Sequence, residues 1–169
     1  MNRTIKITIF LAIVACLSGL SIGIVNSFTA PIIEENAKIA EKKNLELIFP
    51  DGEFIEIDYE DIDKVILGIY EVEGKGFVFK ASCKGYNSSN PIVTLIGMDL
   101  NGTIINVIAL QEQETKGVGT KCFEEENVVK LYIGKTLDQE VDGITGATFT
   151  SDAMKTMISK AQEAFKEVK

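Results

Sequence analysis

The sequence predicts an α+β protein, in which an N-terminal transmembrane helix is followed by one small domain built on an antiparallel sheet with flanking helices. Three observations support this. The run from Ile7 to Val25 is uncharged and almost wholly apolar, about as long as a helix that crosses a bilayer core. Between Val65 and Leu110 apolar residues alternate with polar ones, as in half-buried strands. From Met154 onward they recur at helical spacing, and strands followed by helices are typical of this fold class.

The charges beside the apolar run predict its orientation. Arg3 and Lys6 precede the run, whereas the flank that follows begins with acidic residues. By the positive-inside rule, residues 1–6 are cytoplasmic, residues 7–28 form the transmembrane helix, and the rest of the chain lies outside the cytoplasm. This external part holds all 25 acidic residues but only 15 of the 17 basic ones, a formal charge of −10. Such a charge repels phosphate backbones and argues against a nucleic-acid partner.

The apolar run also permits a second interpretation. Ile13-Val14-Ala15-Cys16 resembles a lipobox, in which the cysteine is lipidated and the segment before it is removed. A lipoprotein normally becomes polar directly after its cysteine, but here the apolar run continues to Val25. An uncleaved helix is therefore favoured over a signal segment.

After the span, residues 29–50 are predicted to form a juxtamembrane helix, which Pro50-Asp51-Gly52 ends with turn chemistry. Residues 51–169 form the extracytoplasmic domain. Its strands are expected around 65–69, 77–81, 92–100 and 103–110. A loop at 85–91 separates the second strand from the third, and Asn101-Gly102 predicts a two-residue hairpin between the last two.

The most informative segment is Asp142-Gly143-Ile144-Thr145-Gly146-Ala147-Thr148. Two glycines and an alanine leave the backbone bare around Thr148, so a large planar group can approach its hydroxyl closely. Thr150-Ser151-Asp152 then predicts the start of the C-terminal helix. Thr148 is thus expected near a helix N-terminus, where free N–H groups and the helix dipole favour a phosphate.

A second segment, Glu114-Thr115-Lys116-Gly117-Val118-Gly119, shares this glycine-rich character. Glycines at 117 and 119 let the backbone pass close to a flat ligand and expose N–H donors. Alone it is an ordinary turn, but together with the threonine segment it predicts one binding site.

Both segments resemble motifs of the FMN-binding domains in Rnf and Nqr respiratory complexes. The threonine segment matches Asp-Gly-x-(Ser/Thr)-Gly-Ala-Thr, whose last threonine carries FMN through a phosphoester. Residues 114–119 resemble the flavin-contacting loop Glu-Thr-Pro-Gly-Leu-Gly, with Lys116 in place of proline and Val118 in place of leucine, and without the upstream histidine. The N-terminal anchor, Phe49-Pro50, Gly85-Tyr86 before Pro91-Ile92, and Asn101-Gly102 follow in the order seen in RnfG subunits. The chain is therefore identified as similar to the RnfG family, with NqrC subunits as the related alternative.

The resemblance implies a covalent FMN on Thr148. It assigns contacts with the cofactor to the other residues of the two motifs, namely Asp142, Gly143, Thr145, Gly146, Ala147, Glu114, Thr115, Gly117, Val118 and Gly119. It further implies a membrane-bound electron relay within a ferredoxin:NAD oxidoreductase that couples electron transfer to ion translocation. Its partners would be other integral-membrane subunits, especially RnfD, the iron–sulfur subunits, and a flavin transferase that attaches the FMN. Two alternatives stay open: a lipid-anchored extracellular flavoprotein held by Cys16, and a structural subunit that is never flavinylated.

The cysteines and the missing histidines narrow the chemistry further. The chain has three cysteines and no histidine, so a four-cysteine cluster and the usual zinc and haem sites are not expected. Cys83 and Cys122 either form a disulfide or remain free thiols, and the sequence leaves both open. No nucleophile–base pair stands out. We therefore assign no catalytic residue and no metal ligand, and expect an electron-carrying subunit that is not an independent catalyst.

Overall fold

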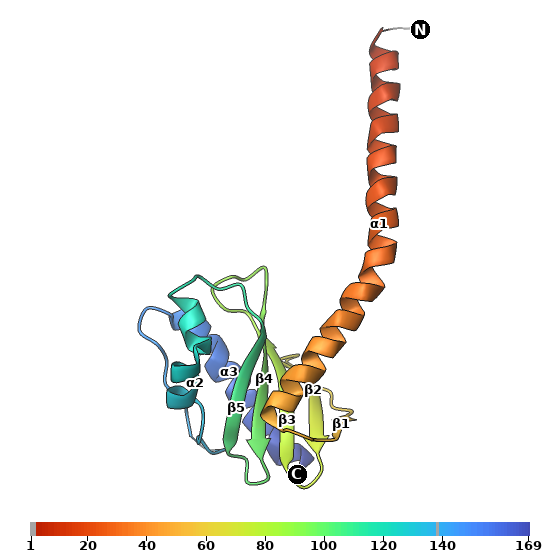
Figure 1. Ribbon diagram of the computed structural model, residues 1–169. Helices are drawn as coiled ribbons and strands as arrows, with labels where there is room; N and C mark the ends of the chain where they lie inside the picture. The colour runs from red at the N-terminus through yellow and green to blue at the C-terminus, as the bar shows by residue number, and fades with distance from the viewer. Residues whose placement is uncertain (1–2, 138) are drawn as a thin grey trace. The chain divides into compact units, whose positions relative to one another are not determined.

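The computed structural model describes residues 3–137 and 139–169, which form an α+β protein as the sequence predicts (Figure 1). The chain divides into two compact units, one ending at Lys42 and the other spanning Lys43–Lys169. The elements, in chain order, are α1 (Arg3–Ile48), β1 (Phe54–Ile57), β2 (Ile66–Val72), β3 (Gly76–Cys83), β4 (Ile92–Asp99), β5 (Ile104–Gln111), the 3-10 helix η1 (Gly119–Phe123), α2 (Glu125–Leu131) and α3 (Thr148–Val168).

Helix α1 is one continuous helix where the sequence analysis predicts two, at 7–28 and 29–50. It passes through Pro31, which lacks an N–H group and so costs the helix one hydrogen bond. Just before it, the hydroxyls of Ser27 and Thr29 donate to carbonyls about one turn back, at 2.8 and 3.0 Å. No glycine or second proline follows Pro31 until Pro50, so nothing ends the helix there.

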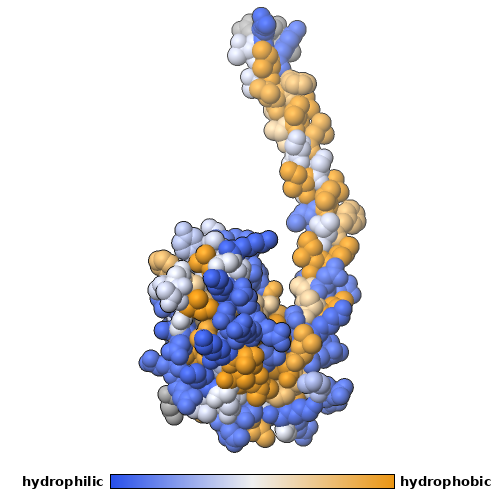
Figure 2. Space-filling model, turned by 60° about the vertical axis from the view of Figure 1, so that its left-hand side comes forward, coloured by the Kyte–Doolittle hydropathy of each residue, from blue (hydrophilic) through white to orange (hydrophobic). Residues whose placement is uncertain are grey.

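The N-terminal part of α1 presents apolar side chains around its whole circumference. Figure 2 shows them along much of the helix, where residues such as Phe10, Leu17 and Ile22 are exposed. By length and composition α1 is able to cross a membrane. A helix that is apolar all round needs lipid or other helices to cover it, so this surface agrees with a membrane span.

The sheet is a five-stranded antiparallel meander in the order β1-β2-β3-β4-β5. Four of the strands fall where the alternation predicts them. The fifth, β1, has only four residues and lies at one edge, where Phe54 pairs with Val72 and Ile57 with Ile69. A run this short carries too few alternations to be recognised from its sequence.

The β4–β5 hairpin is present, but its loop has three residues, Leu100 to Gly102, and not two. Gly102 takes a φ of 79° and donates its N–H to the Asp99 carbonyl at 3.0 Å. The Asp99 carboxylate accepts the N–H groups of Asn101 and Thr103, both at 2.8 Å. Burial works to raise the pKa of Asp99, but these backbone donors outweigh it and the pKa is lowered. The Asp99 carboxylate thus stabilises the three-residue loop, whereas the sequence predicts a loop of two residues.

Each face of the sheet has its own core. Helix α3 covers one face, where the ring of Phe165 meets that of Phe77 edge-on at 5.5 Å (Figure 1). On the other face the last turns of α1 bring Leu45 and Ile48 into a smaller cluster with Phe49, Val72, Val78 and Leu95. A Cβ on Gly97 would collide with the Ile48 side chain, so the helix end packs directly on the β4 backbone. The compact unit Lys43–Lys169 therefore includes the last turn of α1.

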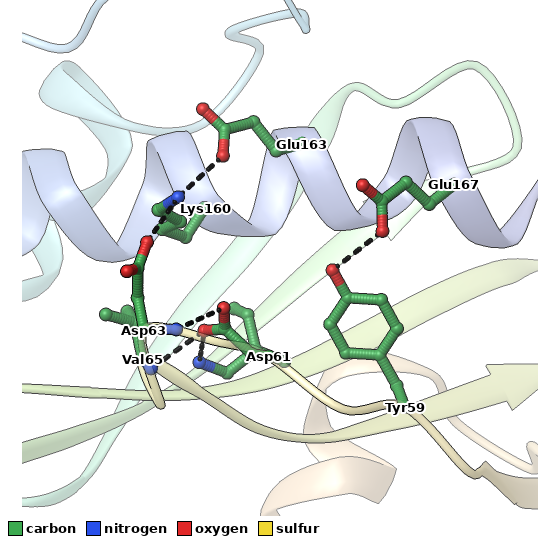
Figure 3. Close-up of polar contacts among 8 residues, drawn as sticks. Tyr59, Asp61, Asp63, Val65, Lys160, Glu163 and Glu167 are labelled. Atoms are coloured by element: carbon green, nitrogen blue, oxygen red, sulfur yellow. Dashed lines mark hydrogen bonds and ion pairs between the residues drawn. The ribbon is translucent and has the colours of Figure 1, made fainter.

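The segment between β1 and β2 is organised by the Asp61 carboxylate (Figure 3). Asp61 accepts the N–H groups of Asp63 at 3.1 Å, and of Val65 and Ile66 at 2.8 Å each. Burial works to raise the pKa of Asp61, but the three backbone hydrogen bonds dominate and lower it. The turn therefore depends on the ionised side chain.

Two polar contacts hold this segment against α3 (Figure 3). The Lys160 ammonium lies 2.8 Å from the Asp63 carboxylate and 2.9 Å from that of Glu163 on the next turn. The Tyr59 hydroxyl donates to the Glu167 carboxylate at 2.9 Å. These contacts are at the surface, where single ion pairs contribute little, so their role is to fix the segment in place.

We predict that Asp61→Asn lowers the stability of the domain at neutral pH, and that the difference from the unmodified chain disappears in acid. The folded pKa of Asp61 lies below its unfolded value, so its contribution is fully present above about pH 4 and is lost as the pH falls through the folded pKa. Urea denaturation from about pH 7 to about pH 2.5 measures this. A difference that persists unchanged at the lowest pH contradicts the assigned role of the charge.

Candidate functional site: a pocket at the start of α3

The two glycine-rich segments meet in one pocket of about 360 Å³ at the end of the sheet where β3 and β5 finish. The connection between β3 and β4 closes its remaining side. The lining residues come from these three segments: Tyr86; Glu114, Thr115, Val118 and Gly119; and Gly146, Ala147, Thr148, Phe149 and Thr150. The structure thus brings residues of 114–119 and of 142–148 together around one pocket. A larger hollow of about 530 Å³ runs along α3 and includes no residue of either motif.

The threonine segment enters α3 through a tight turn. The Ala147 N–H donates to the Ile144 carbonyl at 3.0 Å, and Gly146, the third residue of the turn, has a φ of 86°. This is a type II turn, which places glycine at that position because other residues strain there. Thr148 follows as the first residue of α3 and is exposed to solvent.

The start of α3 differs from the prediction in its capping. The sequence predicts a helix start at Thr150-Ser151-Asp152, but α3 begins at Thr148, with Ala147 at the N-cap and no side-chain cap. The hydroxyls of Thr150 and Ser151 bond elsewhere and are therefore not available as caps. The N–H groups of the first turn have no partner within the helix, which leaves them free for an anion beside Thr148.

Ser151 contacts residues 143 and 144 of the segment that leads into α3. Its hydroxyl accepts the Ile144 N–H at 2.9 Å, and a Cβ on Gly143 would lie only 3.0 Å from the Ser151 Cβ. Gly143 is thus needed for space and Gly146 for its backbone angle. The Cys122 sulfur lies 3.7 Å from the same hydroxyl, and burial raises the pKa of this thiol. Cys122 and Cys83 are both free thiols in this structure, as is Cys16 on α1.

The segment 114–119 repeats the same kind of turn. The Val118 N–H donates to the Thr115 carbonyl at 3.1 Å, and Gly117 in the third position has a φ of 72°. Lys116 occupies the second position, where proline is favoured in type II turns. The turn therefore forms with Lys116 at the position where the resembling motif has proline.

A buried carboxylate joins the segments. Glu114 is 7% exposed and accepts hydrogen bonds from the Thr150 hydroxyl at 2.5 Å and from the N–H groups of Tyr86 and Asn87 at 3.3 Å each. It is the only carboxylate among the described lining residues. The charge of this side chain therefore lies at the edge of the pocket.

The structure separates the predicted site residues into two groups. Seven line the pocket: Glu114, Thr115, Val118, Gly119, Gly146, Ala147 and Thr148. Asp142, Gly143, Thr145 and Gly117 lie outside the lining. Thr145 and Gly117 belong to the two turns that present it, and Gly143 packs against Ser151.

Sequence reasoning missed Tyr86, Phe149 and Thr150 as lining residues. The rings of Tyr86 and Phe149 are 6.0 Å apart at an interplanar angle of 55°, and they are 68% and 66% exposed. Phe149 lies off the buried face of α3, so an aromatic residue at an exposed position beside the motif was the available signal.

The arrangement suits a flat aromatic group that ends in a phosphate. Its ring can lie in the pocket beside Tyr86, Val118 and Phe149, while the phosphate reaches Thr148 and the first turn of α3. The backbone N–H groups in the first turn of α3 can bind such a phosphate, and the exposed Thr148 hydroxyl can form an ester with it. The residues present therefore fit FMN.

Comparisons with known proteins agree with this assignment. The family model of the FMN-binding domain matches residues 85–163, and this range contains every residue that lines the pocket. The family model of the RnfG N-terminal region matches residues 1–48, and this range ends where α1 ends. The chain is 22% identical over 192 aligned residues to the G subunit of the Na(+)-translocating ferredoxin:NAD(+) oxidoreductase complex of Acetobacterium woodii, covering 96% of this chain and 92% of the relative. It is 28% identical over 180 residues to the G subunit of the ion-translocating oxidoreductase complex of Photorhabdus laumondii, covering 90% and 85%.

We predict that Gly146→Ala destabilises the domain by about 1 kcal/mol, because an alanine is strained at a φ of 86° although its Cβ would have open space. Gly146→Asn should cost less, since asparagine tolerates this region. Gly68→Ala is the matched control, because its Cβ would make an ordinary 3.7 Å contact and its φ is not positive. Urea denaturation compares the three variants. Equal stability of the Ala and Asn variants at residue 146 would contradict the turn assignment.

Proposed function

The chain belongs to the RnfG family of FMN-binding subunits, and on that premise we propose that it carries FMN through a phosphoester to Thr148. The observation that supports this most directly is the position of Thr148, which is exposed, lines the pocket and opens α3. The chain is an electron-transfer subunit of an Rnf-type ion-translocating oxidoreductase complex.

The other hydroxyl residues near the motif are poorer candidates for the attachment. Thr150 is 1% exposed and donates to Glu114, and Ser151 is 4% exposed and accepts from Ile144. Thr145 does not line the pocket. Of the hydroxyl residues from 145 to 151, Thr148 is the one that both lines the pocket and is exposed to an enzyme.

Attachment needs a second protein. The chain has no histidine, and no base hydrogen-bonds to the Thr148 hydroxyl among the described residues. Joining a free phosphate monoester to an alcohol in water is unfavourable, so we infer a flavin transferase that uses an activated FMN donor. The Thr148 oxygen then forms the new bond to phosphorus, the donor's leaving group departs with the bonding electrons, and the hydroxyl proton is released.

The residues of this chain bind and orient the cofactor, while the bound FMN supplies the redox chemistry by accepting two electrons and passing them on singly. The side chains of Tyr86, Val118 and Phe149 would cover part of the ring, and their exposure puts this side of the pocket at the surface of the domain. We propose that electrons pass between this side and neighbouring subunits, among which RnfD and the iron–sulfur subunits are the expected partners. The chain itself has no predicted site for NAD.

The protein is membrane-associated through α1, and we propose that the domain from residue 51 onward lies outside the cytoplasm. Arg3 and Lys6 before the apolar run, and the excess of acidic residues after it, support this orientation. A covalent bond to FMN is useful in such a place, because it prevents loss of the cofactor to the exterior.

We predict that Thr148→Ala abolishes the flavin fluorescence of the denatured protein in a gel, because no other accessible hydroxyl of the motif lines the pocket. The protein must be produced in a host that contains the transferase. Thr145→Ser is the control and should keep the fluorescence, since it preserves a small hydroxyl residue. Persistent fluorescence in Thr148→Ala would move the attachment to another residue.

We predict that a thiol at position 62 reacts with a membrane-impermeant reagent in intact cells stripped of their wall. Ile62 is 97% exposed, so Ile62→Cys is accessible, and the background carries Cys16→Ala, Cys83→Ser and Cys122→Ala. The matched control is Thr4→Cys in the same background, which should react only after lysis. The reverse pattern would invert the topology.

The mass of the protein with its natural sequence, isolated from membranes, distinguishes a lipid anchor on Cys16 from a transmembrane helix. A mass that lacks the first fifteen residues and includes a diacylglyceryl group on Cys16 would indicate the lipid-anchored flavoprotein. The full-length mass with one FMN added supports the transmembrane helix and the attachment together.

A further inference from the structure

The side chain of Glu114 occupies a space that two glycines leave for it. A Cβ on Gly119 would lie 2.8 Å from both the Cβ and the Oε2 of Glu114, and a Cβ on Gly85 would lie 2.7 Å from its Oε1. Neither glycine has a positive φ, so space is what each of them provides. Gly85 precedes β4 and Gly119 begins η1, so two separate loops leave room for the same carboxylate.

The contacts of this carboxylate reach all three segments that line the pocket. Its oxygens accept the Tyr86 and Asn87 N–H groups of one loop and the Thr150 hydroxyl in the first turn of α3. Its own N–H is held by the Glu112 carboxylate at 2.9 Å. All three groups that contact the Glu114 side chain donate to its oxygens, which is the pattern that an ionised acid accepts.

We propose that Glu114 is a positioning residue that sets the reduction potential of the flavin, by holding a fixed negative charge beside the pocket. The inference rests on the proposed attachment of FMN to Thr148. It goes beyond that function because it assigns control of the flavin's reduction potential to Glu114, to which the flavin is not attached.

The physical argument is electrostatic. Reduction adds electrons to the ring, and a fixed negative charge nearby opposes the gain of further negative charge. Burial makes this opposition stronger than that of a surface carboxylate, because less water and salt screen it. Glu114 therefore lowers the potential and makes the bound flavin a stronger reductant.

The test measures the midpoint potential of the full-length flavinylated protein by titration with dithionite and visible spectroscopy. Glu114→Gln keeps the size of the side chain and removes the charge, so the potential should rise. Glu125→Gln removes the same charge from the exposed first turn of α2 and should shift the potential much less. A Glu114→Gln potential equal to that of the unmodified protein overturns the proposal.

A second pair of variants decides the matter if Glu114→Gln does not fold. Thr150→Val removes a hydroxyl dipole that partly offsets the carboxylate charge, while the Tyr86 and Asn87 N–H groups still hold the carboxylate, so the potential should fall slightly. Thr150→Ser restores a donor and should return the potential to its original value. A purely structural role predicts altered melting temperatures without this pattern of potentials, and an unchanged potential in Thr150→Val would count against Glu114.

Gel fluorescence of each denatured variant separates this inference from the proposed function. If the protein of natural sequence shows no fluorescence, the proposed covalent attachment of FMN is wrong. Fluorescent variants whose potentials do not move mean that the flavin is attached but that Glu114 does not tune it.

Discussion

The hydrogen bond from the Thr150 hydroxyl to the Glu114 carboxylate joins two segments of the pocket wall that lie 36 positions apart. This contact ties the segment after β5 to the start of α3. The same carboxylate also accepts the N–H groups at Tyr86 and Asn87, so the third wall depends on it as well. Because a buried acid is costly unless its oxygens are satisfied, the three walls and the carboxylate stabilise one another.

The rest of the domain fixes the elements that carry these walls. Helix α3 is held along its length by buried residues such as Met154, Met157 and Phe165, which pack on one face of the sheet. At the middle of the helix, Thr94 on β4 donates to the sulfur of Met157 at 3.6 Å, and at its start the Thr150 hydroxyl donates to Glu114. The first turn of α3 therefore has little freedom to move relative to the strands, and the pocket is formed by rigid elements at its base and by short turns at its rim. Such a site is suited to holding a cofactor in one orientation.

The sequence predicted the features that follow from residue types alone, and it did not predict those that depend on contacts between particular residues. Alternation located four strands, and the glycine pattern indicated both turns of the site. The strand β1, the three-residue hairpin loop and the continuous path of α1 through Pro31 were not predicted, since each depends on neighbours such as Val72, Asp99 or Thr29. Thr150 and Ser151 looked like caps because their types favour that role, but the structure uses their hydroxyls to hold Glu114 and Ile144.

The glycines of the two motifs have different uses, which a motif alone does not reveal. Gly117 and Gly146 have positive φ values and open space around them, so their role is conformational. Gly119 and Gly143 have ordinary angles but no room for a Cβ, because Glu114 or Ser151 fills that space. A side chain at the first kind of position strains the turn, whereas one at the second kind displaces a buried polar group. The motif thus reflects two constraints, one from the turns that expose Thr148 and one from the side chains packed beneath them.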